Sequence, residues 1–138
     1  WCLGFASPEA EKLYEEVRGV YSRLREAVHP GMRLMDLQDQ ANDLFEALGH
    51  PTGRSRPGTL EGSVHLLGHG VGLYIHEGPI IGSPAWPDAL LQPGMVLAIE
   101  PGLYYPAREV GVRLEDTFYV NPQGAIEPLA DYPLDLIL

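Results

Sequence analysis

Three of the five histidines lie in the stretch HLLGHGVGLYIHEGP (residues 65–79), as His65, His69 and His76. Their spacings of four and seven would place all three imidazoles on one face of a helix. Three glycines alternate with them, however, and each glycine costs a helix interior about 1 kcal/mol relative to alanine. We therefore expect this stretch to be extended or looped, because glycines let a backbone or a ligand approach closely. The pattern predicts a functional site rather than a core element.

Two glutamates downstream could complete a set of ligands. Glu100 ends the β-rich segment MVLAIE (residues 95–100), and Glu115 lies two residues after Arg113 on the polar side of a second alternating segment. Carboxylate oxygens and imidazole nitrogens are together suited to a divalent transition metal. One glutamate or one histidine alone would more often be a solvated or hydrogen-bonded group. The prediction of a metal site therefore depends on both residue types occurring together.

The composition excludes several classes of protein. At 138 residues, with 45% hydrophobic and 20% charged residues, the chain fits one globular domain with a modest core. No apolar run approaches the roughly 18 residues of a membrane span, and no signal peptide is visible. Cys2 is the only cysteine, so no internal disulfide can form and we expect a cytoplasmic location. Nine basic and nineteen acidic residues give a net charge of −10, which argues against binding to nucleic acid.

The first part of the chain predicts two amphipathic helices that would support such a site. In SPEAEKLYEEVRGVYSRLREAVHPG, Ser7 can cap a helix that begins at Pro8, and Pro30-Gly31 ends it. Its apolar stripe contains Leu13, Val17, Val20, Leu24 and Ala27. A second helix is predicted over LMDLQDQANDLFEAL (residues 34–48), ended by Gly49. Its apolar face contains Leu34, Leu37, Ala41, Leu44 and Leu48.

The remaining segments predict loops and strands. The first six residues are expected to be the end of a strand. Residues 50–63, rich in Gly, Pro and Ser, form either a lid or rim loop or a linker between two domains. After a turn at residues 105–111, residues 110–120 alternate as one strand, with Val110, Val112 and Leu114 facing one way and Arg113, Glu115 and Thr117 the other. Helices first and strands after them predict an α+β domain.

Three stretches resemble the successive motifs of a known enzyme family: HLLGHGVGLYIHEGP, LLQPGMVLAIEPGLYY and GVRLEDTFYVNPQG. They are similar to the pita-bread metallopeptidases of family M24, which include prolidase, aminopeptidase P and methionine aminopeptidase. GVRLED is closer to the proline-specific branch, that is, to Xaa-Pro dipeptidase and aminopeptidase P. The resemblance implies a partial pita-bread fold, with two helices followed by a mainly antiparallel β-sheet. It also implies a metal-dependent exopeptidase that hydrolyses the N-terminal Xaa-Pro bond of dipeptides or peptides.

The resemblance also assigns metal ligands by position in this sequence. His69 matches a metal-binding histidine, Glu100 a ligand that also transfers protons, and Glu115 the carboxylate that bridges two metal ions. It implies two divalent ions, manganese, cobalt or zinc, in the whole protein. The imidazole and the two carboxylates are then expected to meet near one point.

Three further residues match groups that act on the substrate or on the ligands. His65 and His76 match histidines that contact the substrate or stabilise the tetrahedral intermediate. Arg113 matches an arginine beside the bridging glutamate, where its charge would hold Glu115 ionised. The alternatives are a hydrogen-bonded structural role for His65 and a simple ion pair for Arg113. The expected partner is a peptide with proline at its second position.

Two further ligands of the family have no counterpart in this sequence. They are aspartates about eleven residues apart on a hairpin, and no two aspartates of this chain are separated by eleven residues. We therefore expect residues 1–138 to be a single domain, the C-terminal portion of the catalytic domain, with that hairpin and an N-terminal domain upstream. The isolated chain should be inactive and bind at most one metal ion weakly. A sheet edge left open by the hairpin predicts self-association, with a homodimer as the expected assembly.

Two other functions fit the sequence less well. A non-catalytic pita-bread module that binds peptides or proteins would not require the matches at His69, Glu100 and Glu115. A metal-free hydrolase of the creatinase kind would not require both glutamates. A phosphate-binding loop is weaker still, because GHGVG lacks the longer glycine pattern and no helix signal follows it.

Overall fold

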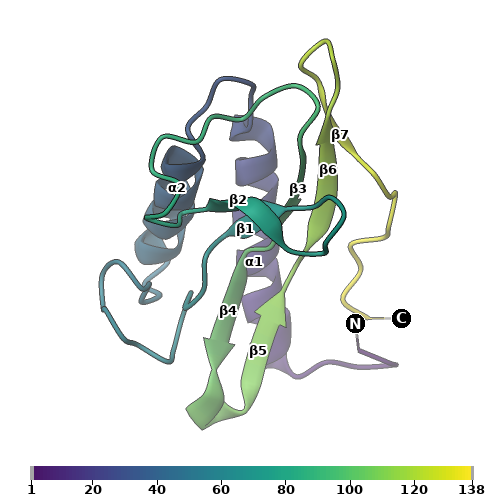
Figure 1. Cartoon of the computed structure of the whole chain (residues 1–138). Coiled ribbons are helices and arrows are strands. Elements are labelled where there is room, and N and C mark those ends of the chain that lie inside the picture. Colours follow the sequence, from purple (N-terminus) through teal and green to yellow (C-terminus); the bar gives the residue numbers. More distant parts are fainter. Residues whose placement is uncertain (1, 138) are drawn as a thin grey trace.

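The computed structural model describes residues 2–137, which form two helices followed by short strands (Figure 1). Helix α1 spans Pro8–Ala27 and helix α2 spans Leu34–Ala47. The strands are β1 (Gly68–Gly70), β2 (Glu77–Ile81), β3 (Val96–Ile99), β4 (Gly102–Tyr105), β5 (Val110–Arg113), β6 (Asp116–Val120) and β7 (Ile126–Pro128), with a 3₁₀ turn η1 (Pro106–Arg108) after β4.

The strands form two antiparallel sheets in front of the helices (Figure 1). One sheet has the order β2-β1-β3-β6-β7, and the other consists of β4 and β5. Every pairing between these strands is antiparallel. Helix α1 packs against β4 and β5, and α2 packs against β2 and α1. The predicted α+β arrangement of two helices followed by a mainly antiparallel sheet is confirmed.

Helix α1 forms as its sequence predicts. The Ser7 hydroxyl accepts a hydrogen bond from the Ala10 backbone N–H at 3.2 Å, and Pro8 occupies the first turn, where its missing N–H is not needed. Ala27 is only partly buried, but the rest of the predicted stripe is at most 3% exposed: Leu13, Val17, Val20 and Leu24. Neither α1 nor α2 is long and apolar enough to cross a membrane.

Helix α2 buries a face that differs from the predicted one at its C-terminal end. Leu48 is 48% exposed and Leu44 is only partly buried, whereas Phe45 is 0% exposed and fills the core. The helix ends at Ala47, and Gly49, with φ of 87°, turns the chain away. The prediction that Leu48 belongs to the buried face is therefore wrong.

The predicted continuous strand over residues 110–120 is also wrong, because the structure divides it into β5 and β6. Strand β6 belongs to the five-stranded sheet, while β5 pairs with β4 in the separate sheet. The predicted alternation holds as far as Glu115: Val110, Val112 and Leu114 are partly buried, and Arg113 and Glu115 are exposed. Thr117, predicted on the exposed side, is partly buried.

The division arises at a bend between two strand pairs. The pairing of β3 with β6 ends there, and the pairing of β4 with β5 begins beyond it. The β3–β6 ladder ends before Glu100-Pro101 on one strand, and Leu114-Glu115 are left out on the other. Proline has no backbone N–H to donate to a ladder. The Leu114 N–H instead donates to the Pro101 carbonyl at 3.2 Å. Both candidate carboxylates, Glu100 and Glu115, therefore lie at this bend, on facing strands.

The loop prediction for residues 50–63 is confirmed, since this segment contains no helix or strand. Apolar residues from both sides of it, such as Phe45 and Leu67, belong to one core cluster. The alternative of a linker between two domains is therefore wrong.

The strand expected in the first six residues is not formed by residues 2–6. Cys2 makes an isolated parallel bridge with Ile137, so the two ends of the described chain lie side by side (Figure 1). Trp1, which also belonged to that prediction, lies outside the described residues.

Strand β1 fits closely between β2 and β3 because its two glycines have no side chains. A Cβ atom at Gly68 would lie 2.0 Å from the Ala98 carbonyl oxygen of β3, and one at Gly70 would lie 2.7 Å from the Gly78 carbonyl oxygen. The residue between them, His69, is 5% exposed. These glycines therefore allow a histidine to sit in the middle of the sheet.

We predict that Gly68→Ala destabilises the protein by about 1–3 kcal/mol, because the added methyl group must push β1 away from β3. The control is Gly53→Ala, where a Cβ would meet nothing within 4 Å; its effect should stay within about 0.5 kcal/mol. Chemical denaturation of both variants measures the difference. Equal stability of the two variants would contradict the packing described for β1.

Candidate active site and metal centre

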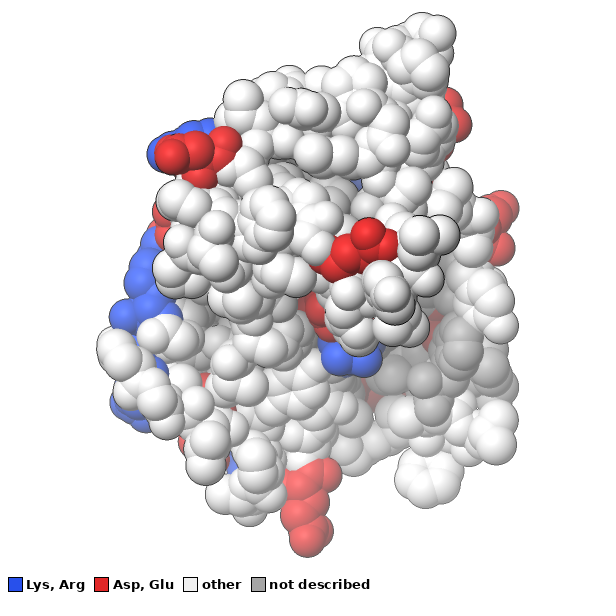
Figure 2. Space-filling model, in the orientation of Figure 1, with Lys and Arg blue, Asp and Glu red and all other residues white. Residues whose placement is uncertain are grey.

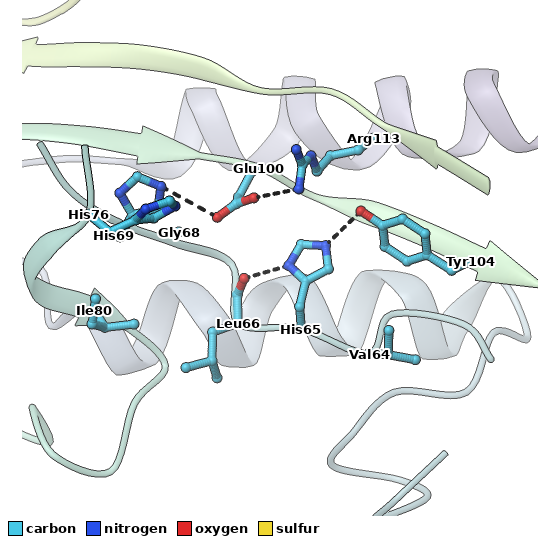
Figure 3. A pocket seen from close by; sticks show the side chains of 10 residues that line it. All are labelled: Val64, His65, Leu66, Gly68, His69, His76, Ile80, Glu100, Tyr104 and Arg113. Atoms are coloured by element: carbon cyan, nitrogen blue, oxygen red, sulfur yellow. Dashed lines mark hydrogen bonds and ion pairs between the residues drawn. The ribbon is translucent and has the colours of Figure 1, made fainter. Parts of the chain in front are cut away.

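A cavity of about 510 Å³ opens beside β1 and β4 (Figure 3). Its lining consists of Val64, His65, Leu66, Gly68, His69, His76, Ile80, Glu100, Tyr104 and Arg113. Five of the six predicted site residues are in this lining, and the sixth, Glu115, is not. The fold thus gathers residues from three separate stretches of sequence around one hollow.

The His69 imidazole has the orientation of a metal ligand. Its Nδ1 lies 3.0 Å from the Gly70 carbonyl oxygen, which can only accept, so Nδ1 carries the proton of the neutral ring. The lone pair of Nε2 is then free, and Nε2 lies 3.7 Å from Glu100 Oε1. Histidine ligands of metals usually donate their second ring N–H to a carbonyl or carboxylate in this way. Two facing acceptors are stable together only with a cation or a proton between them.

Arg113 joins the two candidate carboxylates across the bend. Its Nη1 lies 3.2 Å from Glu100 Oε2, and its Nη2 lies 3.3 Å from Glu115 Oε2. The Glu100 side chain is 14% exposed, so its charge needs a nearby partner more than that of the half-exposed Glu115 does. One guanidinium therefore holds two like charges near each other, as charge-assisted pairs allow.

Glu115 is the predicted ligand that does not line this cavity. It lies beside a second cavity of about 810 Å³, bounded by the β5–β6 segment, the start of α1 and residues 129–136. Among residues 2–137, no three His, Cys, Asp or Glu side chains are close enough together to hold one metal ion. The donor types fit a divalent cation, but only His69 and Glu100 face each other directly, and Glu115 is connected to them through Arg113.

His65 is fixed on both sides of its ring. Its Nδ1 lies 2.7 Å from the Leu66 carbonyl oxygen, so Nδ1 donates and Nε2 accepts from the Tyr104 hydroxyl at 3.1 Å (Figure 3). Burial raises the pKa of Tyr104, although the nearby Arg113 opposes this shift. The Tyr104 hydroxyl therefore remains a donor at neutral pH and holds the His65 ring at the edge of the cavity.

His76 stands beside the buried His69. The centroids of the two rings are 4.2 Å apart, and their planes are inclined by 53°. Its own side chain is exposed, at the end of the loop between β1 and β2. The Glu77 carboxylate accepts a hydrogen bond from the Tyr74 N–H at 2.8 Å and so shapes this loop. His76 is thereby available to a bound molecule, while His69 faces Glu100.

Tyr104 is the site residue that the sequence analysis did not identify. A usable signal was present, because Glu100, Gly102 and Tyr104 are spaced by two residues and share one side of an extended strand. The bend at Pro101 shifts the strand pairing without removing this relation. A side chain two positions beyond a candidate ligand was therefore a fair candidate for the same cavity.

Charged side chains are unevenly spread on the face shown in Figure 2. The Lys and Arg side chains on this face lie mainly along its left edge, next to acidic ones, and no broad basic patch crosses it. Phosphate backbones are bound by such patches. That the protein does not bind nucleic acid stays a prediction.

Comparison with known proteins gives matches over nearly the whole chain. Residues 1–122 match Metallopeptidase family M24. The Xaa-Pro dipeptidase of Pyrococcus furiosus is 36% identical over 123 residues, which are 89% of this chain and 32% of that protein. The solved structure of a dipeptidase from Pyrococcus horikoshii OT3 superimposes with a TM-score of 0.81 at 32% identity, covering 98% of this chain and 34% of the other.

An X-Pro aminopeptidase from Thermotoga maritima MSB8 has a similar structure, with a TM-score of 0.80 at 28% identity over 99% of this chain and 35% of the other. The chain spans about a third of the length of the relatives it matches. These matches confirm the resemblance and the partial pita-bread fold that the sequence predicts.

We predict that Arg113→Gln, measured without metal in the presence of EDTA, lowers the free energy of unfolding by about 1–3 kcal/mol, because the largely buried Glu100 charge loses its partner. Arg108→Gln is the control. Arg108 pairs with Glu9 at 2.7 Å near the surface, and its loss should cost under about 1 kcal/mol.

The same measurement on Arg113→Gln combined with Glu100→Gln should recover part of the lost stability, because no unpaired charge then remains. Denaturant titration at neutral pH compares all four proteins. A double variant that is less stable than Arg113→Gln alone would show that the guanidinium does not act through Glu100.

Proposed function

Because this chain belongs to Metallopeptidase family M24, we propose that the protein carrying it is a metal-dependent exopeptidase that hydrolyses the bond between an N-terminal residue and a following proline. Relatives named as a dipeptidase, an Xaa-Pro dipeptidase and an X-Pro aminopeptidase support the proline-specific branch. Both dipeptides and longer peptides with proline at the second position are proposed substrates.

One observation carries the proposal: Nε2 of His69 and the Glu100 carboxylate face each other in a cavity. Their separation of 3.7 Å is too long for a hydrogen bond. A divalent cation would satisfy both groups. His69, Glu100 and Glu115 are the proposed ligands, with Glu115 released from Arg113 when the cation binds.

The chain's own residues divide the remaining work. Glu100, oriented by its ion pair with Arg113, can accept and transfer a proton as well as hold the cation. His76 is exposed beside His69 and can donate to an oxyanion that develops on the substrate. His65, whose ring is fixed by Tyr104, can contact and orient the bound peptide.

The proposed cofactor is a pair of divalent ions, manganese, cobalt or zinc, in the whole protein. Such ions supply Lewis acidity and lower the pKa of water. The three candidate ligands of this chain carry two carboxylate charges, which suits at most one dication. The homodimer, the cytoplasmic location and the boundaries of a single catalytic domain stay predictions.

The direct test is an assay of the whole protein against Xaa-Pro dipeptides and longer Xaa-Pro peptides with manganese added. We expect Glu100→Gln to lower kcat by about 10²–10⁴-fold, because the variant cannot accept a proton. Glu26→Gln, on the exposed side of α1, is the control and should leave kcat unchanged. An unaffected Glu100→Gln enzyme, or hydrolysis only of peptides without proline, would refute the assignment.

For the 138-residue chain itself, we predict that calorimetric titration with manganese or zinc at neutral pH finds no more than one weak site. His69→Gln should abolish that binding, because it removes the nitrogen ligand at the centre of the set. His29→Gln, an exposed histidine outside the cavity, should leave it unchanged. Two tight sites per chain, or equal effects of both substitutions, would contradict the proposed ligand set.

A further inference from the structure

Residues 50–63 form a loop that is tied to α2 at one end and to the active-site cavity at the other; it is called the anchored loop below. In Figure 1 it runs at the lower left, from the end of α2 to the side of β4. None of the roles assigned above depends on it. Its contacts nevertheless form a chain of interactions that begins at the surface of α2 and ends at Tyr104, which holds the His65 ring.

The first tie is a cluster of acidic side chains on α2 that binds Arg54. The Arg54 guanidinium lies 2.6 Å from Asp43 Oδ1, 2.7 Å from Glu46 Oε2 and 3.7 Å from Asp39 Oδ1. These pairs lower the pKa of Glu46, with the hydrogen bond from Arg54 as the largest cause. A single exposed pair would contribute little, but a guanidinium shared among three carboxylates restricts the loop more strongly.

The second tie is buried. Thr52 is 0% exposed, and its hydroxyl donates to Glu46 Oε1 at 2.6 Å. The same residue bridges to Ser63, whose N–H donates to the Pro51 carbonyl at 2.9 Å. The two ends of the loop are therefore closed on each other, two residues before His65.

The third tie reaches the cavity through Gly62. Its N–H donates to the Tyr104 carbonyl at 2.8 Å, and the Tyr104 N–H donates to the Gly62 carbonyl at 3.0 Å. Gly62 has φ of 87°, and a Cβ there would lie 1.9 Å from the Pro51 carbonyl oxygen, so only glycine fits. The loop thus runs along the free edge of β4 and fixes the backbone of the residue that holds His65.

We propose that the anchored loop is a positioning element, in which Arg54 and Gly62 hold the His65–Tyr104 pair at the rim of the cavity. Neither residue lines the cavity, so both act through their neighbours rather than on the substrate. The consequence for catalysis depends on the proposed peptidase function, whereas the consequence for the His65 ring does not. Loosening the loop should leave the core intact and let the His65–Tyr104 hydrogen bond open.

The test compares Arg54→Gln with Arg56→Gln, two substitutions on the same loop. The Arg56 side chain is exposed and makes no ion pair or hydrogen bond among those found in residues 2–137. Nitrogen-15 NMR of the His65 imidazole, in metal-free protein, reports its tautomer directly. We expect Arg54→Gln and Tyr104→Phe each to shift or broaden the His65 signals toward those of a free imidazole, and Arg56→Gln to leave them in place.

In the whole enzyme, Arg54→Gln should lower kcat on an Xaa-Pro peptide on the order of tenfold with little change in KM, because a catalytic geometry is loosened. The loss should be smaller when Tyr104→Phe is already present, and Arg54→Lys should restore part of it. Unchanged His65 signals in Arg54→Gln, or equal effects of Arg54→Gln and Arg56→Gln, would overturn the proposal. If the whole protein cleaves no peptide, the proposed function fails, and the NMR comparison still decides the role of the loop.

Discussion

The bend at Pro101 is the constraint on which the rest of the structure depends. Proline cannot donate to the ladder, so one strand loses its pairing at Glu100-Pro101 and the facing strand loses it at Leu114-Glu115. A continuous ribbon would have directed successive side chains regularly to two faces. The interruption instead separates two sheets and leaves two carboxylates at their junction, where Arg113 reaches both.

Electrostatics at this junction favour a cation beside Glu100. Glu100 contacts a guanidinium through one oxygen and faces an imidazole nitrogen, at 3.7 Å, through the other. The oxygen that faces His69 therefore has no hydrogen bond from that ring. A low-exposure carboxylate in this state favours a cation, which connects the geometry to the metal dependence proposed for the family member. The Arg113 bridge also means that Glu115 cannot join the ligand set without a change of partner.

Glycines at positions of close backbone approach determine where His69 and His65 lie. Gly68 and Gly70 let β1 lie between its neighbours, so that His69 is buried at the centre of the sheet. Gly62 fills the same kind of tight position on the anchored loop, beside β4. Close backbone approach is thus used twice, once to seat a candidate ligand and once to fix the strand that holds His65. Both arrangements would be lost with any larger residue.

The sequence alone determined the helices, the order of helices and strands, and the identities of the candidate site residues, because capping residues, apolar periodicity and short motifs are local signals. Local signals also misled at Leu48 and over residues 110–120, where a helix end and a broken ladder depend on what packs nearby. Only the tertiary structure decided that Arg113 bridges two glutamates and that Glu115 does not line the cavity with His69. These relations join residues distant in sequence, and their distances are set by strand register and by a bend that no short pattern encodes.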